Sequence, residues 1–299
     1  MHRLNSEPTA SAPSSALAGA SYEAVLRANV DLHSQLAATY KAHEPHYRPE
    51  NIAHVRSVMQ ELTRRTKGKR MLDLGCGAGF MVDIARDLVT HIDGVDITPA
   101  MLSQIDLSGP ASIRLFESDT ATVSVAEGAY DLVTSYAFLH HLKDIGPSLR
   151  TAARALREGG VYYADLDPNA HFWEAANALG DRDDLHPILK REVDSVLSMD
   201  EQLEAKFGVA PDTFNLAEYG KSLRGGFSED DLVAQLKSAG FRHVEVKYYW
   251  HIGQARIAHD PSLDDRTRAV VLEQIGFMLA ASQPLSRALY KYIGFVATR

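Results

Sequence analysis

The sequence is poor in cysteine and has no long apolar run. Its 299 residues include one cysteine, Cys76, so neither an intramolecular disulfide nor a cysteine-rich zinc site can form. No stretch of about 18 apolar residues occurs, which argues against a membrane partner. Residues 1–20 are rich in Ala, Ser and Pro and lack the features of a secretory signal or a transit peptide. We therefore expect a cytoplasmic protein in which residues 1–21 form a flexible tail.

The sequence also lacks an excess of basic residues. It has 31 Lys and Arg against 39 Asp and Glu, which gives a formal net charge of −8. A protein that binds nucleic acid through its phosphates needs a basic face, so we expect no nucleic-acid partner. With 45% hydrophobic and 23% charged residues, the chain has enough apolar material for the core of one or two globular domains.

The middle of the chain alternates short apolar segments with helical ones. Strands are predicted at residues 70–74, 91–97, 112–116, 130–136, 161–166, 241–249 and 292–298. Strands that alternate with helices indicate βαβ crossovers and a parallel sheet covered on both faces. We predict an α/β fold, a doubly wound, seven-stranded and mostly parallel sheet with helical cap insertions.

Glycines cluster where the first predicted strand meets its helix. Residues 73–79 read Asp-Leu-Gly-Cys-Gly-Ala-Gly. Glycines tolerate the backbone angles of such a sharp reversal and let a ligand lie against the main chain, beside unpaired N–H groups of the next helix. A dinucleotide fold expects Gly-x-Gly-x-x-Gly, whereas here the third glycine, Gly79, comes one residue early. Asp73 suits a ligand with an ammonium group and would repel a pyrophosphate.

This segment resembles motif I of the class I S-adenosylmethionine-dependent methyltransferases, Asp-x-Gly-x-Gly-x-Gly. The resemblance extends over about residues 69–166 and the last strands. It implies that Asp96, about 20 residues after Gly75, binds both ribose hydroxyls and that Asp119 accepts a hydrogen bond from the adenine amino group. The S-adenosylmethionine site implied by the resemblance consists of Asp73, Gly75, Cys76, Gly77, Gly79, Asp96, Ile97, Met101, Asp119, Thr120 and Tyr136.

Residues 135–142, Ser-Tyr-Ala-Phe-Leu-His-His-Leu, resemble the exit of the family's fourth strand, which faces the reacting methyl group. The candidate catalytic residues are therefore His140, His141 and Tyr136. Histidine is the usual general base near neutral pH, although such a pair can also serve only to shape the helix start. The ring of Tyr136 can pack on the sulfonium or form a plain wall of the site.

Two further segments supply candidate acceptor-binding residues. The segment 40–48 is dense in polar side chains between helix-breaking prolines, and ligands bind beyond the carboxyl end of a strand such as the fifth. The candidates are Tyr40, His43, Tyr47, Arg48, Asp167, His171 and Trp173. The spacing of His43 and His46 fits no strong metal signature, so we expect no metal.

The predicted organisation places a helical lid before the core and two helical insertions after it. Residues 22–68 are the N-terminal helical lid and residues 69–166 the Rossmann-like core that binds S-adenosylmethionine. Residues 167–226 are a helical cap insertion, and residues 227–299 hold the end of the sheet with a second helical insertion. The helical insertions depart from the family's pattern.

The predicted function is the transfer of a methyl group from S-adenosylmethionine to a small organic metabolite beneath the cap. Two alternatives stay open: a transferase of the same fold that moves another group, such as aminopropyl, and a non-catalytic S-adenosylmethionine-binding regulator. The sequence does not determine the acceptor atom or whether the chain forms a homodimer.

Overall fold

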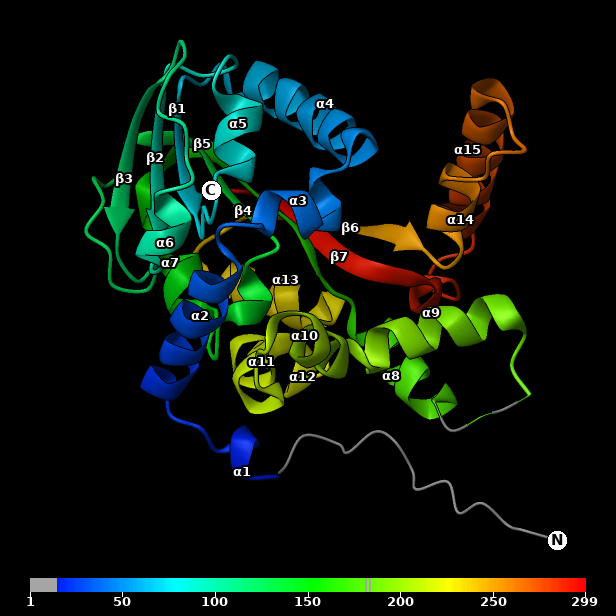
Figure 1. Cartoon of the computed structure of the whole chain (residues 1–299). Coiled ribbons are helices and arrows are strands. Elements are labelled where there is room, and N and C mark those ends of the chain that lie inside the picture. The colour runs from blue at the N-terminus through cyan, green and yellow to red at the C-terminus, as the bar shows by residue number, and fades with distance from the viewer. Residues whose placement is uncertain (1–14, 181, 183) are drawn as a thin grey trace, which may run out of the picture.

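The computed structural model describes residues 15–180, 182 and 184–299, and its centre is one seven-stranded sheet (Figure 1). The strand order is β3-β2-β1-β4-β5-β7-β6. The strands are β1 Arg70–Leu74, β2 His91–Asp96, β3 Ser112–Glu117, β4 Tyr130–Tyr136, β5 Leu156–Pro168, β6 His243–His251 and β7 Tyr290–Thr298. β1 to β5 pair in parallel, and β7 runs antiparallel to both β5 and β6. The predicted seven-stranded, mostly parallel sheet is confirmed. Residues 1–14 of the expected tail lie outside the described residues.

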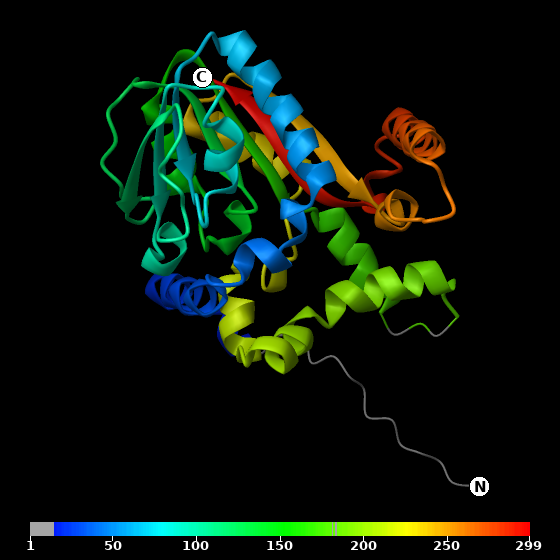
Figure 2. The same cartoon turned by 45° about the horizontal axis from the view of Figure 1, so that its top comes forward.

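Helices cover both faces of the sheet (Figures 1 and 2). On one face, α7 (Gly146–Ala155) and α13 (Glu229–Ala239) pack together over the central and β6 strands. On the other face, α4 (Pro49–Thr66) and α5 (Phe80–Ala85) pack against β4 and β5. The inner strands are apolar on both sides because each face is buried, as parallel sheets require.

The parallel register brings the carboxyl ends of four strands to one edge of the sheet. Leu74 at the end of β1 pairs with Val95 of β2, and Asp96 pairs with Glu117 of β3. Asp73 of β1 pairs with Thr134 of β4, two residues before that strand ends. The segments that leave these strands therefore lie side by side, and the short α6 (Pro99–Leu102) and η2 (Leu139–His141) follow two of them.

The first insertion is built from five helices and packs against the N-terminal helices. Its helices are α8 Ala170–Leu179, α9 Pro187–Leu197, α10 Met199–Phe207, α11 Pro211–Ala217 and α12 Tyr219–Ser222. α9 and α10 are separated at Ser198, which has a non-helical backbone. α2 (Tyr22–Leu36) lies along α11, where Leu32 and Leu36 share a core with Phe214 and Ala217. The short α1 (Ser15–Ala18) precedes α2, and α3 (Tyr40–His43) and η1 (Pro45–Tyr47) lead on to α4.

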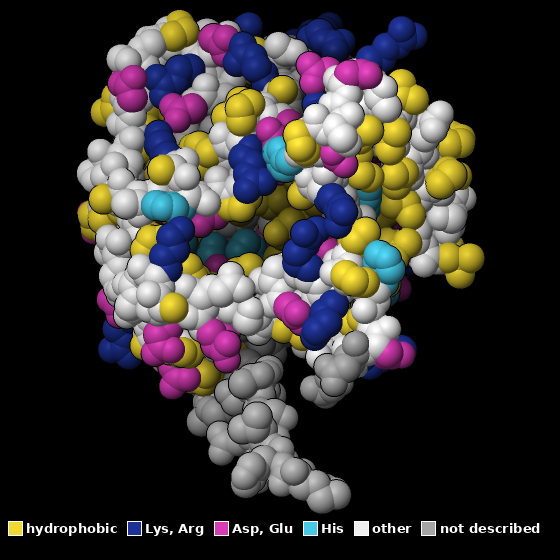
Figure 3. Space-filling view, turned by 45° about the vertical axis from the view of Figure 1, so that its right-hand side comes forward, with side chains coloured by type: hydrophobic (Ala, Val, Ile, Leu, Met, Phe, Trp, Pro, Cys, Tyr) yellow, Lys and Arg dark blue, Asp and Glu magenta, His cyan; other side chains and the backbone are white. Residues whose placement is uncertain are grey.

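The second insertion projects from the β6–β7 edge of the sheet (Figures 1 and 2). It comprises α14 (Gln254–Ala258), α15 (Asp265–Ala281) and η3 (Arg287–Leu289), and α15 buries none of its residues. Phe277 and Met278 are exposed there, and Figure 3 shows hydrophobic side chains gathered at the right of this side of the molecule. Among the described residues, none of the helices combines the length and apolar character that crossing a membrane requires.

Candidate active site

A partly open pocket lies where β1, β2, β3 and β4 end. Its floor consists of the loop after β1 and the residues that follow the other three strands. Its remaining walls come from α2, α3 and η1. The pocket is therefore closed by a segment that precedes the sheet in sequence.

The glycine loop forms the centre of the floor. Gly75 and Gly77 have positive φ values of 73° and 49°, which favour glycine. A Cβ atom on Gly75 would lie 1.9 Å from the ring of Phe138, so this glycine also makes room for a neighbouring side chain. Cys76 is buried, and burial raises the pKa of its thiol well above the usual range. It contributes backbone and small size to the loop, not a reactive thiolate.

Asp96 braces this loop from the end of β2. Its Oδ2 accepts a hydrogen bond of 2.8 Å from the backbone N–H of Gly77, and its Oδ1 accepts one of 2.8 Å from Thr98. A carboxylate offers about four acceptor positions, so two stay available toward the pocket. A vicinal diol could donate both of its hydrogens to this one side chain.

Asp73 lies beneath the loop, fully buried. Its Oδ1 accepts a hydrogen bond of 2.7 Å from Thr134, and Oδ2 has no hydrogen-bond partner among the described residues. Burial raises the pKa of Asp73 to about 7. A cation near the loop would favour its ionised form.

One face of α2 runs along the pocket. Tyr22 contacts Asp119 at the end of β3, and Leu26, Asn29 and His33 follow at helical spacing as lining residues. The amide nitrogen of Asn29 donates to backbone carbonyls at 2.9 and 3.0 Å, while its Oδ1 is buried without a partner in the described chain. This buried acceptor is therefore available to a donor group in the pocket.

Five rings form a wall of the pocket beside the loop. They are Tyr40, His46, Tyr47, Phe80 and Tyr136. The ring centroids of Phe80 and Tyr136 are 4.6 Å apart. The hydroxyl of Tyr136 and the side-chain amide of Asn51 exchange hydrogen bonds of 2.9 and 3.1 Å, so Tyr136 presents its ring to the pocket. Burial lowers the pKa of His46 to about 3, so this part of the wall is uncharged at neutral pH.

The two histidines of η2 have different positions. His141 lines the pocket, and its Nδ1 is 2.8 Å from the carbonyl oxygen of Ala217. His140 is buried behind it, with Nδ1 2.8 Å from Oδ1 of Asp167. Burial lowers the pKa of both imidazoles, that of His140 to about 4, so both are neutral near pH 7.

The pocket brings together most, but not all, of the residues that the sequence suggested. The suggested residues that line it are Gly75, Cys76, Gly77, Asp96, Ile97, Met101, Asp119, Thr120, Tyr136, His141, Tyr40 and Tyr47. Those outside its described lining are Asp73, Gly79, His140, His43, Arg48, Asp167, His171 and Trp173. Sequence reasoning missed Leu26, Asn29, His33, Phe80 and Phe138 as lining residues. The helical spacing of the first three was the available signal.

Comparison with known proteins agrees with this arrangement. Residues 72–164 match a family model described as a methyltransferase domain. This part of the chain, which holds most of β1 to β5 and the glycine loop, is thus similar to a methyltransferase domain. A protein named ubiquinone biosynthesis O-methyltransferase from Bordetella avium is 28% identical over 150 residues, which cover 48% of this chain and 62% of that protein. This chain therefore spans less than two thirds of the length of that relative.

Two further comparisons support the domain and the fold. A protein from Mycolicibacterium smegmatis, named as a probable S-adenosylmethionine-dependent methyltransferase, is 22% identical over 200 residues, which cover 67% of this chain and 68% of that protein. A solved structure from Listeria monocytogenes, described as an S-adenosylmethionine dependent methyltransferase, has a TM-score of 0.51 at 15% identity. It covers 83% of this chain and 97% of its own. At that identity the likeness concerns the fold alone.

The residues of the pocket fit S-adenosylmethionine, the cofactor in the name of the Mycolicibacterium relative. The free acceptor positions of Asp96 suit a ribose diol, and the glycine loop admits a ligand against its backbone. The unpaired Oδ1 of Asn29 and the hydroxyl of Tyr47, also unpaired within the described residues, offer further polar contacts. The pocket is thus built for a ligand with several polar groups and an apolar body.

Proposed function

We propose that this protein transfers the methyl group of S-adenosylmethionine to a small organic acceptor. The observation that carries the proposal is the continuity of one pocket from the carboxylates after β2 and β3 to the aromatic wall and His141 after β4. Cofactor and acceptor would share this space, with the reacting methyl group between them.

The strand order gives the cofactor its direction. β3, β2, β1 and β4 are neighbours in that order, so the segments that follow them form a row. We assign the adenine amino group to Asp119, the ribose hydroxyls to Asp96, and the amino-acid tail to the glycine loop above Asp73. The sulfonium then points toward β4. An aromatic face such as that of Tyr136 would stabilise its charge by roughly 0.5–2 kcal/mol.

The acceptor would lie on the far side of the methyl group, beside His141. The carbonyl of Ala217 can only accept a hydrogen bond, so Nδ1 of neutral His141 carries the hydrogen and Nε2 keeps its lone pair. That lone pair can hold an acceptor hydroxyl or take its proton. We assign His140, enclosed and bonded to Asp167, to the support of η2 and not to contact with the acceptor.

α2 and the first insertion would act as the cap over the acceptor. The carbonyl of Ala217 in α11 bonds His141, and α11 packs on α2, whose adjacent face lines the pocket. A site closed in this way suits a small metabolite and excludes water. For methyl transfer, the exclusion of water matters more than acid–base catalysis. The donor is already activated, and its sulfur leaves as a neutral thioether. The name of the Bordetella relative favours oxygen as the acceptor atom.

A screen of acceptors with full-length protein tests this proposal. We expect S-adenosylhomocysteine to bind in calorimetry. We also expect S-adenosylhomocysteine to be produced from S-adenosylmethionine with at least one member of a panel of phenols, carboxylic acids and amines. Mass spectrometry of the product should show the addition of one methyl group. Cofactor binding without turnover on the whole panel would support a binding-only protein, and a different added mass would support another group transfer.

A further inference from the structure

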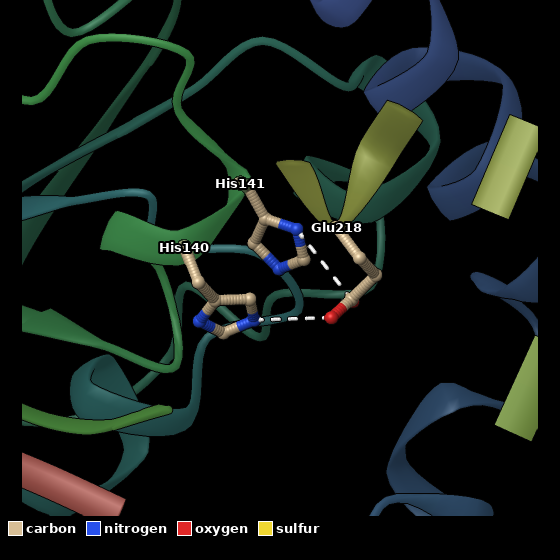
Figure 4. A group of neighbouring side chains, drawn as sticks. All are labelled: His140, His141 and Glu218. Atoms are coloured by element: carbon tan, nitrogen blue, oxygen red, sulfur yellow. Dashed lines mark ion pairs between the residues drawn. The ribbon is translucent and has the colours of Figure 1, made fainter. Parts of the chain in front are cut away.

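The two histidines of η2 face a buried glutamate of the first insertion (Figure 4). Nε2 of His140 is 3.6 Å from Oε2 of Glu218, and Nδ1 of His141 is 3.7 Å from Oε1. One ligand atom of each of the three residues lies within 4.8 Å of the others. The side chains of all three are about nine-tenths buried. Two imidazoles and a carboxylate from distant parts of the chain thus lie together next to the part of the pocket that we assign to the acceptor.

Nδ1 of His141, the nitrogen 3.7 Å from Glu218, is also the one that is bonded to Ala217, so Nε2 is its available metal ligand. Nδ1 of His141 donates to the carbonyl of Ala217. Nδ1 of His140 faces Oδ1 of Asp167, an oxygen that already accepts the backbone N–H of His140 at 3.0 Å. The hydrogen of neutral His141 is therefore on Nδ1. Burial raises the pKa of Asp167 to about 8, and with Asp167 in its ionised form the hydrogen of neutral His140 is on Nδ1 as well. A histidine that binds a metal ion typically donates its other N–H to a carboxylate or a backbone carbonyl in this way.

The lone pair of His140 consequently faces a carboxylate oxygen of Glu218, an arrangement that a cation between them would stabilise. Two ligands at 2.0–2.1 Å from a tetrahedral ion are about 3.3 Å apart, close to the 3.6 Å between Nε2 and Oε2. We propose that His140, His141 and Glu218 bind a divalent transition-metal ion such as Zn²⁺. Two histidines with one glutamate and an open fourth position are a ligand set of catalytic zinc sites.

The proposed metal site adjoins the pocket through His141. His141 lines the pocket, whereas His140 and Glu218 are outside its described lining. In the metal-bound protein the Nε2 lone pair of His141 would bind the ion, and the acceptor would contact the ion in place of this lone pair. An oxygen of the acceptor would be the natural fourth ligand. This last step rests on the proposed function, whereas the metal site itself does not.

Lys221 competes with the ion. Its ammonium group forms an ion pair with Oε2 of Glu218, and Lys221 is itself largely buried. Among the other charged or titratable groups nearby, His33 of α2 has its ring 4.8 Å from that of His141. Like charges repel, so a bound ion must displace the ammonium group from Glu218 or tolerate it. Removal of this positive charge should therefore tighten metal binding, which a structural ion pair alone would not predict.

Metal titration of the full-length protein tests the site without any acceptor. After treatment with a chelator, wild-type protein is titrated with Co²⁺, followed by visible absorption, and with Zn²⁺ in competition with a chromophoric chelator. We expect one equivalent to bind. His140→Ala, His141→Ala and Glu218→Gln should each weaken binding at least tenfold, and Lys221→Met should strengthen it severalfold. His33→Ala, a neighbouring histidine outside the proposed ligand set, should bind as the wild type does.

The same variants separate this inference from the proposed function. Circular dichroism and S-adenosylhomocysteine calorimetry should show that Glu218→Gln and Lys221→Met remain folded and bind cofactor normally. Absence of stoichiometric binding by both wild type and Lys221→Met would overturn the metal site and leave the methyltransferase proposal intact. Binding that survives Glu218→Gln and both histidine substitutions would also overturn it, because the metal would then occupy other groups.

Discussion

The hydroxyl of Tyr22 donates a hydrogen bond of 2.5 Å to Oδ2 of Asp119, which joins the first turn of α2 to the end of β3. Leu26 and Asn29, on the same face of α2, line the pocket. This bond therefore holds α2 over the end of the pocket that we assign to adenine. A hydrogen bond to a charged group contributes about 1.5–3 kcal/mol when well buried, and less here because Tyr22 is only half-buried.

Tyr22→Phe should make entry of the cofactor faster. The substitution keeps the ring and removes the bond that holds α2 against β3, so we expect the association rate of S-adenosylhomocysteine to rise about 2- to 10-fold. Surface plasmon resonance on immobilised protein measures this rate. Tyr219→Phe is the matched control, since its hydroxyl donates to the carbonyl of Ala18 outside the pocket. Equal association rates for wild type and Tyr22→Phe would mean that α2 does not limit entry.

Asp96→Ala should weaken cofactor binding strongly. It removes the acceptor proposed for the ribose hydroxyls and also the brace on the backbone of Gly77. With two charge-assisted hydrogen bonds lost, each contributing about 0.5–3 kcal/mol, we expect affinity for S-adenosylhomocysteine to fall at least tenfold in calorimetry. Glu117→Ala, the neighbour of Asp96 in the register of β3, should bind normally. An unchanged affinity for Asp96→Ala would remove this residue from the cofactor site.

The sheet, and the side of the pocket formed by the ends of β1, β2 and β3, were predictable because they depend on local signals. A short apolar run followed by glycines identifies the end of β1, and parallel strands that end together bring Asp96 and Asp119 to the same edge. The spacing between these residues follows from the lengths of the strand and helix between them. Three-dimensional contacts add little to that part of the reasoning.

The acceptor end was less predictable because it depends on how separate helices pack. Asn29 lies on α2, which is buried on two sides, one against α11 and one against the pocket. In the sequence, a single polar residue on such a helix is indistinguishable from one on a solvent-exposed face. Trp173 follows β5 in sequence, but on α8 its side chain is buried in a small hydrophobic core shared with α9. Glu218 reaches the histidines only through the fold of the insertion, where Gly220 leaves no room for a Cβ atom beside the backbone of His140. None of these pairings has a fixed sequence spacing.

His141→Ala should abolish most turnover and leave cofactor binding intact. The imidazole lies at the acceptor end of the pocket, so its loss removes a proton acceptor or ligand for the acceptor but no group assigned to the cofactor. We expect kcat to fall about 10²- to 10⁴-fold with an acceptor found in the screen. Release of S-adenosylhomocysteine gives kcat, and calorimetry gives cofactor affinity. His171→Ala, outside the described lining of the pocket, is the control, and full activity of His141→Ala would limit this residue to a structural role.

His46 should make the protein less stable in acid, and a variant can isolate this effect. Burial lowers the pKa of His46 from about 6.5 to about 3, so between these values the unfolded chain binds a proton that the folded chain does not. Its contribution to the free energy of unfolding is complete above pH 6.5 and falls by about 1.4 kcal/mol per pH unit below pH 6. The buried carboxyl groups of Asp73 and Asp165, whose pKa values are raised to about 7, act in the opposite direction over this range.

The comparison of wild type with His46→Gln cancels those opposing carboxyl groups. Urea unfolding at several pH values should give a stability difference, wild type minus variant, that decreases by about 2–3 kcal/mol between pH 7 and pH 4.5. The sign follows from the proton that unfolded wild type gains and the variant cannot. A difference that stays constant with pH would show that the folded and unfolded chains protonate His46 equally, so that the aromatic wall would become charged below about pH 6.5.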